Sequence, residues 1–317
     1  DKASIILTPT AYNNGEALCV KPSDGSGDFD FSRNSAATRV NAQGLVENVQ
    51  ILSSNLVQNG SFSEEGSEEV SNGSFSQEGA QLVTNGSFDT DSDWVKTSQV
   101  TIENGIANIV SNDGSFQMLG QNNVVTTGKY YVLTYTIVSS NSGSLKFSSL
   151  GQINSTVGTH KIYFVATETA INIARNSGIT DISIDNVSVR EVGQDWSLGT
   201  GWSIAEDKAV CEANGGFDTL NQAFVLNSGN SYKVTYTADL SLITSGTLKL
   251  GTFSNSASER TILDGTNTAY LTASGTTFQI NEGGAIGTAT ITNISVKEVG
   301  QNWVLVNATI GNDLVLL

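Results

Sequence analysis

The strongest constraint on the fold is a duplicated stretch of sequence. Residues 184–196 read IDNVSVREVGQDW, and residues 291–303 read ITNISVKEVGQNW. The copies end at Trp196 and Trp303, roughly 100 residues apart, which is the length of a small β-sandwich and longer than a solenoid repeat. The sequence therefore predicts a modular chain in which each copy closes one module.

The bulk composition limits the classes of function. The 317 residues include 38% hydrophobic residues, enough to form a core in each of two or three domains. With 31 acidic against 15 basic residues the net charge is −16, and no Lys/Arg cluster occurs, so the chain would repel nucleic-acid phosphates. No run of about 18 apolar residues and no signal-peptide pattern occurs. We therefore expect a soluble protein with no nucleic-acid partner and no membrane insertion.

Strand patterns occur in both modules at matching places. Residues 130–137 and 231–238 alternate between polar and β-branched or aromatic residues, and residues 143–147 and 246–250 follow them in the same order. No amphipathic helix of 12 or more residues is evident, and turn signals recur about every ten residues. The predicted fold is all-β, with sandwich modules at 82–194 and 195–301. Residues 302–317 form a C-terminal strand or the start of a truncated third repeat.

The N-terminal block, residues 1–50, differs in composition from the modules. Residues 28–40 alternate in part and precede an Asn-Ala-Gln-Gly turn at 41–44, which predicts a hairpin with extended flanks. About 50 residues are too few for a strong core. We expect this segment to dock on a partner or on another copy of the chain.

A short repeat fills the predicted connector, residues 51–81, and continues into the first module. Asn-Gly-Ser-Phe occurs three times at 13-residue intervals, at residues 59–62, 72–75 and 85–88. The Asn-Gly turn signal after a short apolar stretch favours strand, turn and strand. Two interpretations are open. The repeats are either a solvated linker made by duplication of the next module's first strand, or short strands added to a neighbouring subunit.

The first module carries a family resemblance. An Asn-Gly-Ser-Phe-Asp opening, the Trp at position 94, a Gly-Lys-Tyr-Tyr-Val-Leu-Thr-Tyr middle and an Ile-Asp-Asn-Val-Ser-Val end resemble carbohydrate-binding modules of the family four and nine type. The resemblance covers about 110 residues per copy and implies tandem jelly-roll β-sandwiches, galactose-binding-like in fold. The second module departs from it, because it lacks the Asn-Gly-Ser-Phe-acid opening.

The resemblance also implies a structural calcium ion. Its ligands would come from Asp89 after the opening Phe and from Asp185 of the closing strand, with Asp91 as a further donor, because calcium takes several oxygen ligands. The alternative is that the acids of residues 89–93 are a solvated turn. The second module has Thr292 at the position of Asp185, so no calcium is expected there.

Sugar binding in such modules relies on exposed aromatic rings. The candidates are Trp94, Phe116, Tyr163, Trp202 and Tyr270. A ring within a strand is more often part of the core than of a binding platform. Trp94 and Trp202 recur in the two copies beside the first strand, and such recurrence favours packing.

A second resemblance concerns the N-terminal block. Residues 29–49, FDFSRNSAATRVNAQGLVENV, are similar to a segment at the start of virion-associated proteins of tailed bacteriophages, in particular crAss-like phages. This resemblance implies a head or tail fibre on the virion surface. The protein would form a homo-oligomer, with a trimer favoured, contact other virion proteins through this segment and adhere to host-surface glycans.

No pattern of catalytic residues emerges. His160 is the only histidine, it precedes a strand, and Cys19 and Cys211 have no partner pattern. Nothing marks a pair of carboxylates for glycoside hydrolysis. We expect a non-enzymatic protein. Two rivals are a decoration or scaffold protein without sugar binding, and a non-catalytic module of a secreted bacterial polysaccharide-degrading protein.

Overall fold

The structure is a computed structural model. It describes residues 11–13, 16–18, 37–40, 43–49, 57–253, 258–303, 309–311 and 314–316. The chain divides into two units, Asp1–Gln58 and Asn59–Leu317. In the first unit β1 (Ala11–Asn13) pairs with β2 (Glu16–Leu18), and β3 (Ala37–Val40) pairs with β4 (Val46–Val49). The second pair confirms the predicted hairpin; apart from these strands and the turn residues 43–45, the predicted docking segment lies outside the described residues.

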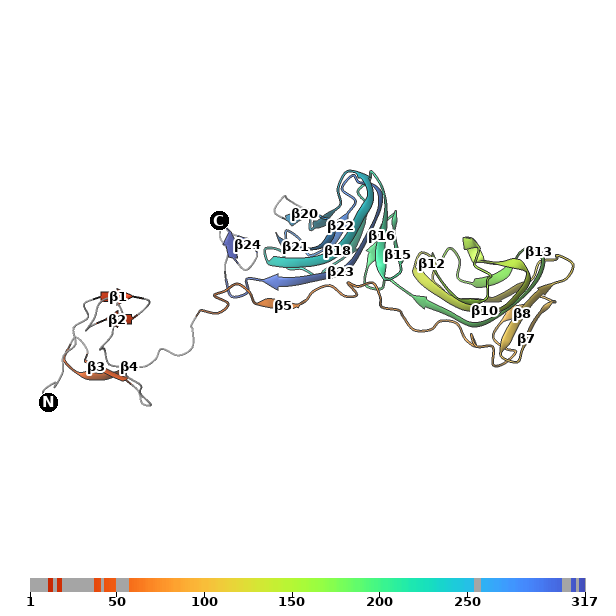
Figure 1. The fold of residues 1–317 in the computed structure, drawn as a ribbon, viewed down its shortest axis with the longest axis horizontal. Helices are drawn as coiled ribbons and strands as arrows, with labels where there is room; N and C mark the ends of the chain where they lie inside the picture. The colour runs from red at the N-terminus through yellow and green to blue at the C-terminus, as the bar shows by residue number, and fades with distance from the viewer. Residues whose placement is uncertain are drawn as a thin grey trace. The chain divides into compact units, whose positions relative to one another are not determined.

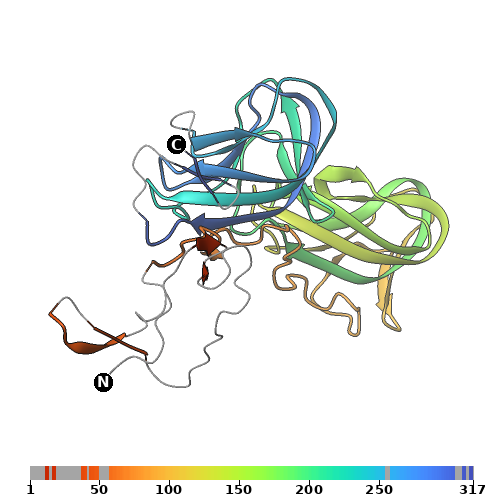
Figure 2. The same ribbon diagram turned by 60° about the vertical axis from the view of Figure 1, so that its left-hand side comes forward.

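The first sandwich of the second unit contains two long strands that each contribute to both of its layers (Figures 1 and 2). One layer has the order β12-β10-β13-β8-β7 and the other the order β11-β10-β13-β9-β6. The bounds are β6 (Val95–Lys96), β7 (Val100–Glu103), β8 (Ile106–Ser111), β9 (Met118–Gln121), β10 (Tyr130–Phe147), β11 (Gly151–Gln152), β12 (Gly158–Val165) and β13 (Ile171–Glu191). A 3₁₀ turn, η1 (Ser148–Leu150), follows β10.

The second sandwich repeats this arrangement with separate strands. Its layers have the orders β21-β18-β23-β16-β15 and β20-β19-β22-β17-β14. The bounds are β14 (Ser197–Leu198), β15 (Trp202–Ala205), β16 (Lys208–Asn214), β17 (Thr219–Gln222), β18 (Ser231–Ser245), β19 (Lys249–Gly251), β20 (Glu259–Thr261), β21 (Gly265–Thr272), β22 (Phe278–Asn281) and β23 (Ile286–Val299). Each strand of one sandwich therefore has a counterpart in the other.

The strand order is that of a jelly roll. In the second sandwich the eight strands β16 to β23 alternate between the layers, except that β19 and β20 pair within one layer. The first and last of these strands, β16 and β23, are neighbours, as in two nested Greek keys. All pairings are antiparallel, and no α-helix occurs among the described residues. The prediction of all-β tandem jelly-roll sandwiches is confirmed. Within the same ranges, no helix has the length and apolar character needed to span a membrane.

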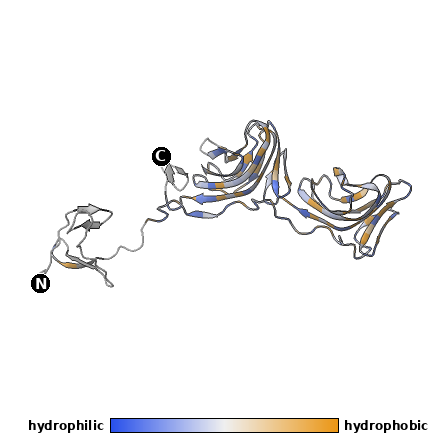
Figure 3. Ribbon diagram, viewed as in Figure 1, coloured by the Kyte–Doolittle hydropathy of each residue, from blue (hydrophilic) through white to orange (hydrophobic). Residues whose placement is uncertain are grey.

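Alternating hydropathy builds the cores, as the banding along the strands in Figure 3 shows. Along β10 the side chains of Tyr131, Leu133, Tyr135 and Ile137 point inward and are at most 2% exposed. At Gly143 (φ +81°) the strand bends from one layer to the other, and a Cβ there would lie 2.7 Å from the carbonyl oxygen of Ile179. Glycine is thus required where β10 changes layer.

The two sandwiches share a packed junction. Val132 and Val192 of the first belong to the same buried cluster as Trp202 of the second. The Tyr130 hydroxyl donates a 2.6 Å hydrogen bond to the backbone carbonyl of Trp202. A pocket of about 580 Å³ lies beside this contact and is lined by Tyr130, Trp196 and Asn221 among others. The junction therefore ties the tandem modules together.

The C-terminal stretch forms a small hairpin. There β24 (Thr309–Gly311) pairs with β25 (Leu314–Leu316).

Candidate functional site

Each Asn-Gly-Ser-Phe copy packs against a different tryptophan. The ring centroids are 5.3 Å apart for Phe88 and Trp94, 5.1 Å for Phe75 and Trp196, and 5.1 Å for Phe62 and Trp303. In every copy the indole Nε1 donates to the backbone carbonyl of the asparagine, at 2.9 Å for Asn85, 3.1 Å for Asn72 and 3.1 Å for Asn59. The repeat is thus one half of a recurring contact whose other half is a tryptophan.

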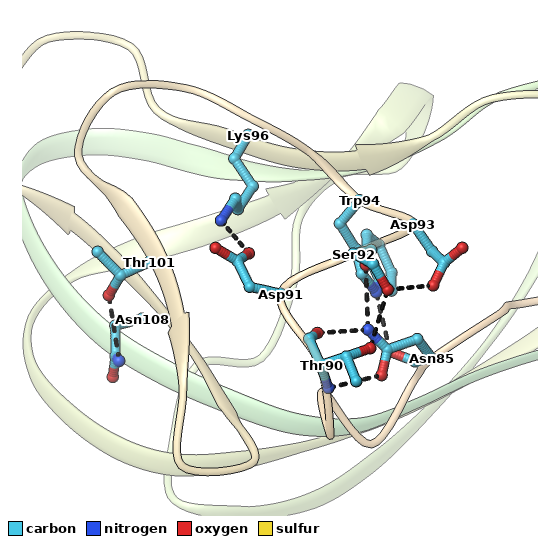
Figure 4. A network of polar contacts seen from close by, with 9 residues as sticks. All are labelled: Asn85, Thr90, Asp91, Ser92, Asp93, Trp94, Lys96, Thr101 and Asn108. Atoms are coloured by element: carbon cyan, nitrogen blue, oxygen red, sulfur yellow. Dashed lines mark hydrogen bonds and ion pairs between the residues drawn. The ribbon is translucent and has the colours of Figure 1, made fainter.

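Figure 4 shows the hydrogen bonds of Asn85 and Trp94 in the first sandwich. The Asn85 side-chain amide donates to the carbonyls of Thr90 and Ser92 at 2.6 and 3.0 Å, while Trp94 donates to the Asn85 carbonyl. The asparagine and the phenylalanine of each copy have positive φ, near +50° and +55° respectively. Asparagine tolerates this left-handed conformation better than most residues. The turn therefore needs the residue types that the repeat conserves among its three copies.

The order of the repeat copies is the reverse of the order of their tryptophans: the third copy contacts the first of the three tryptophans, and the first copy contacts the last. The asparagine and the tryptophan are 9 residues apart in the third copy, 124 in the second and 244 in the first. The third copy therefore opens the first sandwich, and the second copy opens the second sandwich. Residues 195–301 lack this opening in their own sequence, as expected, but the connector supplies Asn-Gly-Ser-Phe from residues 72–75, followed by Ser76 in place of the acid.

The interpretation of the repeats as a solvated linker is wrong. Phe75 and Val70 are 1% and 5% exposed and belong to the core of the second sandwich. The strand β5 (Glu65–Glu68) pairs with β23 beyond the stretch that pairs with β16. The second and third copies are thus structural parts of sandwiches in their own chain, whereas the first copy contacts Trp303.

The backbone of each docked copy approaches its sandwich closely. A Cβ on Gly73 would lie 1.9 Å from the carbonyl oxygen of Ile294, and one on Gly86 would lie 2.0 Å from that of Val187. The carbonyls of these glycines accept hydrogen bonds of 2.9 and 2.8 Å from the amides of Ile294 and Val187. Only glycine fits this approach.

A buried glutamine adds a second matched contact. Gln222 accepts from the Ser71 amide at 3.0 Å and donates to the Ser71 carbonyl at 2.6 Å. Gln121 makes the same two bonds with Thr84 at 3.2 and 2.5 Å. Each sandwich therefore binds the backbone of the residue just before the Asn-Gly turn through paired hydrogen bonds, as a strand-addition site does.

The predicted calcium ligands are distributed over this region. Asp89 accepts from the Ser87 hydroxyl at 2.7 Å and lines an open pocket of about 600 Å³, Asp91 pairs with Lys96, and Asp185 accepts from the amide and side chain of Asn186. Among the described residues no three His, Cys, Asp or Glu side chains form a group that could hold a metal. Calcium at Asp89 and Asp185 thus stays a prediction that needs backbone oxygens as further ligands.

The second sandwich shows what replaces the carboxylate. The Thr292 hydroxyl lies 3.2 Å from the carbonyl oxygen of Ser74 and 3.0 Å from that of Asp207. A hydroxyl can donate to a carbonyl, whereas the ionised Asp185 is an acceptor only.

The predicted aromatic candidates differ sharply in exposure. Trp94 and Trp202 are 8% and 2% exposed and fill the cores. By its contacts the counterpart of Trp94 is Trp196, so the assignment of Trp94 and Trp202 as equivalents is corrected. Tyr163 and Tyr270 are half-buried on matching positions of β12 and β21, and Lys161 lies 5.2 Å from the Tyr163 ring.

Phe116 is the one predicted aromatic that is open to solvent, at 55% exposed. It lies on the loop between β8 and β9, and the Lys146 ammonium is 5.7 Å from its ring centroid. The loop is braced by Ser115, whose amide donates to Asp113, and by the buried Gln117, which donates to the Ser115 hydroxyl at 2.8 Å. Hydrogen bonds from Ser115, and then from Gln99, lower the pKa of Asp113 to about 2.

Sequence reasoning missed the counterpart of this ring. Phe217 occupies the matching loop between β16 and β17 and is 72% exposed. Its carbonyl accepts a 3.0 Å bond from the Asn281 side chain, and Lys249, the counterpart of Lys146, pairs with Glu259 at 2.9 Å. A phenylalanine directly after Gly215 and Gly216 was the available signal, because a Gly-Gly pair marks a loop and loops run over the protein surface.

The other reactive side chains have ordinary structural surroundings. His160 contacts the Thr156 carbonyl at 2.7 Å and packs on Tyr135. Cys211 is fully buried, and burial raises the pKa of its thiol to about 12. Cys19 lies outside the residues described. A thiol with a raised pKa is a poor nucleophile.

The fold and site define a class, a tandem jelly-roll protein with an exposed phenylalanine at matching loops of its two sandwiches. No protein-family model matches the sequence, and no curated protein matches it. Similar solved structures include the CBM22-1–CBM22-2 tandem domain of Xyn10C from Paenibacillus barcinonensis, at 11% identity, covering 70% of this chain and 99% of that one with a TM-score of 0.30.

Two further solved structures are similar at the same level. A fucolectin from striped bass (Morone saxatilis) serum has 8% identity, coverage of 68% and 98%, and a TM-score of 0.22. A Paenibacillus xanthan lyase has 12% identity, coverage of 65% and 25%, and a TM-score of 0.24.

Proposed function

We propose that the chain is a non-catalytic glycan-binding protein with one platform on each sandwich, at Phe116 and Phe217. The observation that carries this proposal is the recurrence of a solvent-exposed phenylalanine in the same loop of both sandwiches. A large ring held in water on a braced loop has no packing role there. Such rings stack on the apolar face of a sugar, while neighbouring polar groups bind its hydroxyls.

The polar groups around Phe116 suit this role. Lys146 lies beside the ring, and on the adjacent strand Asn176 bonds to Ser144 and Gln152 at 3.2 and 3.0 Å. Beside these donors the same loop carries the Asp113 carboxylate, so the platform suits a neutral glycan. One such site binds weakly, and two sites on one chain raise the avidity through effective concentration.

The proposed setting is an appendage on the surface of a phage virion. This part of the proposal depends on the resemblance of residues 29–49, with the N-terminal segment docking on other virion proteins and the chain forming an oligomer, a trimer being favoured. A non-catalytic module of a secreted bacterial polysaccharide-degrading protein would use the same platforms. Negative-stain imaging of purified particles with an antibody to the chain separates these settings.

The binding function is tested with a glycan array. The intact chain should bind bacterial-surface glycans, and the double variant Phe116→Ala/Phe217→Ala should lose about tenfold or more in affinity. Phe224→Ala is a matched control, because Phe224 is 88% exposed on the second sandwich but lies outside the two loops. Absence of binding by the wild-type chain, or equal binding by the double variant, would leave the scaffold interpretation.

A further inference from the structure

The repeat and the sandwich behave as ligand and receptor. The Phe–Trp contact, the indole bond to the asparagine carbonyl and the positive φ of asparagine and phenylalanine recur in all three copies. The chain distance between the two halves varies from 9 to 244 residues. A contact that is kept over such different distances is specified by its own residues and not by the linkage between them.

The receptor on the second sandwich is the free edge of β23 together with Gln222 and Trp196, which we call the docking groove. The strand β16 pairs with β23 only from Ile286 to Ile291, and β5 uses the same edge at Lys297 and Val299. Glu68 accepts from the Val296 amide at 2.6 Å, and Phe75 closes the groove against Trp196. Backbone pairing supplies affinity in such strand addition, and the side-chain pockets supply specificity.

The first sandwich has the same groove. Gln81 accepts from the Val189 amide at 3.0 Å, the Leu82 amide donates to the Val189 carbonyl, and Val83 is buried as Val70 is. Residues 68, 71, 73 and 75 thus make on β23 and its neighbours the contacts that residues 81, 84, 86 and 88 make on β13 and its neighbours.

We infer that each sandwich carries a docking groove for the element Val-x-Asn-Gly-Ser-Phe, and that this groove accepts the element from a second copy of the chain as well as from its own. Exchange of the second repeat between two copies would link them without any new interface. The inference concerns the groove and is independent of glycan binding.

The test uses the full chain and a synthetic peptide. The variant Phe75→Ala weakens the resident repeat, so a fluorescent peptide of residues 66–79 should bind this variant at least tenfold more tightly than the wild-type chain, as measured by anisotropy. The same peptide should bind the Phe88→Ala chain, whose weakened groove is on the other sandwich. A peptide with Gly73→Ala is the matched control, because its one added methyl group clashes with the Ile294 carbonyl. Equal binding of both peptides, or none to a folded variant, would overturn the inference.

A second design keeps every contact residue intact and covers the case in which Phe75→Ala fails to fold. A protease site is inserted after Ala80, an exposed residue, and the chain is cleaved. Residues 1–80 should co-elute with residues 81–317 and be displaced by an excess of the 66–79 peptide. Differently tagged intact chains, mixed and warmed, should then co-purify, and the Gly73→Ala chains should not. Release of residues 1–80 without uptake of peptide would show that docking requires the covalent linkage.

Discussion

The two sandwiches are built to one plan but are opened differently. The first receives its Asn-Gly-Ser-Phe element from the segment directly before it, with Asn85 only 9 residues from Trp94. The second receives its element from a segment that precedes the whole first sandwich in the sequence, with Asn72 124 residues before Trp196. The hydrogen bonds and ring contacts are nevertheless the same. A module in this protein is therefore defined by its contacts and is not a continuous stretch of sequence.

The sandwiches also differ where they carry charge. In the first sandwich Arg175 lies within β13, directly after the residues that pair with β9. Its guanidinium donates a hydrogen bond to the Gly114 carbonyl. At the matching place after β22 the second sandwich has Glu282, which is fully buried beside Gly201 and Gly216. The two sandwiches therefore share their backbone contacts but have a basic residue and an acidic residue at one matched position. A substitution in one sandwich can be compared with the matched position in the other.

The largest expected effect comes from the two buried phenylalanines. Phe75→Ala and Phe88→Ala should each lower the free energy of unfolding by about 3–5 kcal/mol, because both rings are 1% exposed in a core. The structure predicts that Phe75→Ala destabilises the second sandwich although residue 75 precedes the first. Hydrogen exchange measured by mass spectrometry would locate the loss. Faster exchange confined to β6–β13 in Phe75→Ala would contradict the assignment.

A calcium test sharpens the comparison of Asp185 with Thr292. If calcium binds at Asp89 and Asp185, it should stabilise the first sandwich by about 2.7 kcal/mol at a free concentration of 100 times Kd, and a chelator should remove this gain. The variant Asp185→Thr, which copies the second sandwich, should abolish the response to calcium. Melting of the intact chain with calcium and with chelator measures both, and identical melting curves for the wild type would exclude the site.

A smaller effect is expected at Glu282 and depends on pH. Burial raises the pKa of Glu282 above 4.5, the neighbouring Asp218 acts in the same direction, and the backbone amides of Asn214 and Gly216 lower it in part. A raised pKa in the folded state means that Glu282 contributes stability below pH 4.5, which is lost as the pH rises through the folded-state value. Glu282→Gln should therefore stabilise the chain by about 1–2 kcal/mol at pH 8 and have little effect at pH 4.

The matched control for this titration is Glu212→Gln, a nearby exposed acid. Urea denaturation at several pH values gives the comparison. A Glu282→Gln chain with the same pH dependence as the wild type would show that Glu282 is not the titrating group.

Much of the fold was predictable from the sequence. The period-two alternation of residues 130–137 and 231–238 and the duplicated ending predicted tandem all-β sandwiches, since burial of one strand face leaves a pattern in the sequence. The partner of each Asn-Gly-Ser-Phe copy could not be predicted. Identical copies contain no information on which tryptophan each one meets, because the topology of the chain decides that.

The candidate site was less predictable. Phe116 and Trp94 are both aromatic residues near the first strands, yet one is 55% and the other 8% exposed. Their difference arises from the loop between β8 and β9 and from the docking of Phe88, which are features of the tertiary structure. The sequence pattern therefore proposed the residue types, and only the packed sandwich separates platform from core.

The smallest expected effect lies in two acids at matching positions of the repeat. Glu65 lies between Lys233 and Lys297 at 2.6 and 3.0 Å, whereas Glu78 lies 3.0 Å from Lys161 and 3.9 Å from Arg190. Hydrogen bonds from Lys233 and Lys297 lower the pKa of Glu65, so its contribution to the stability of the folded chain is present above pH 4.5 and is lost as the pH falls through the folded-state value.

Partly exposed pairs contribute about 0–1 kcal/mol. Glu65→Gln should therefore cost up to about 1 kcal/mol at pH 7, and Glu78→Gln should cost less because its second cation is farther away. Both losses should shrink in 1 M salt, where the Debye length falls to about 3 Å. A larger loss for Glu78→Gln in urea denaturation would reverse the ranking of the two docked repeats.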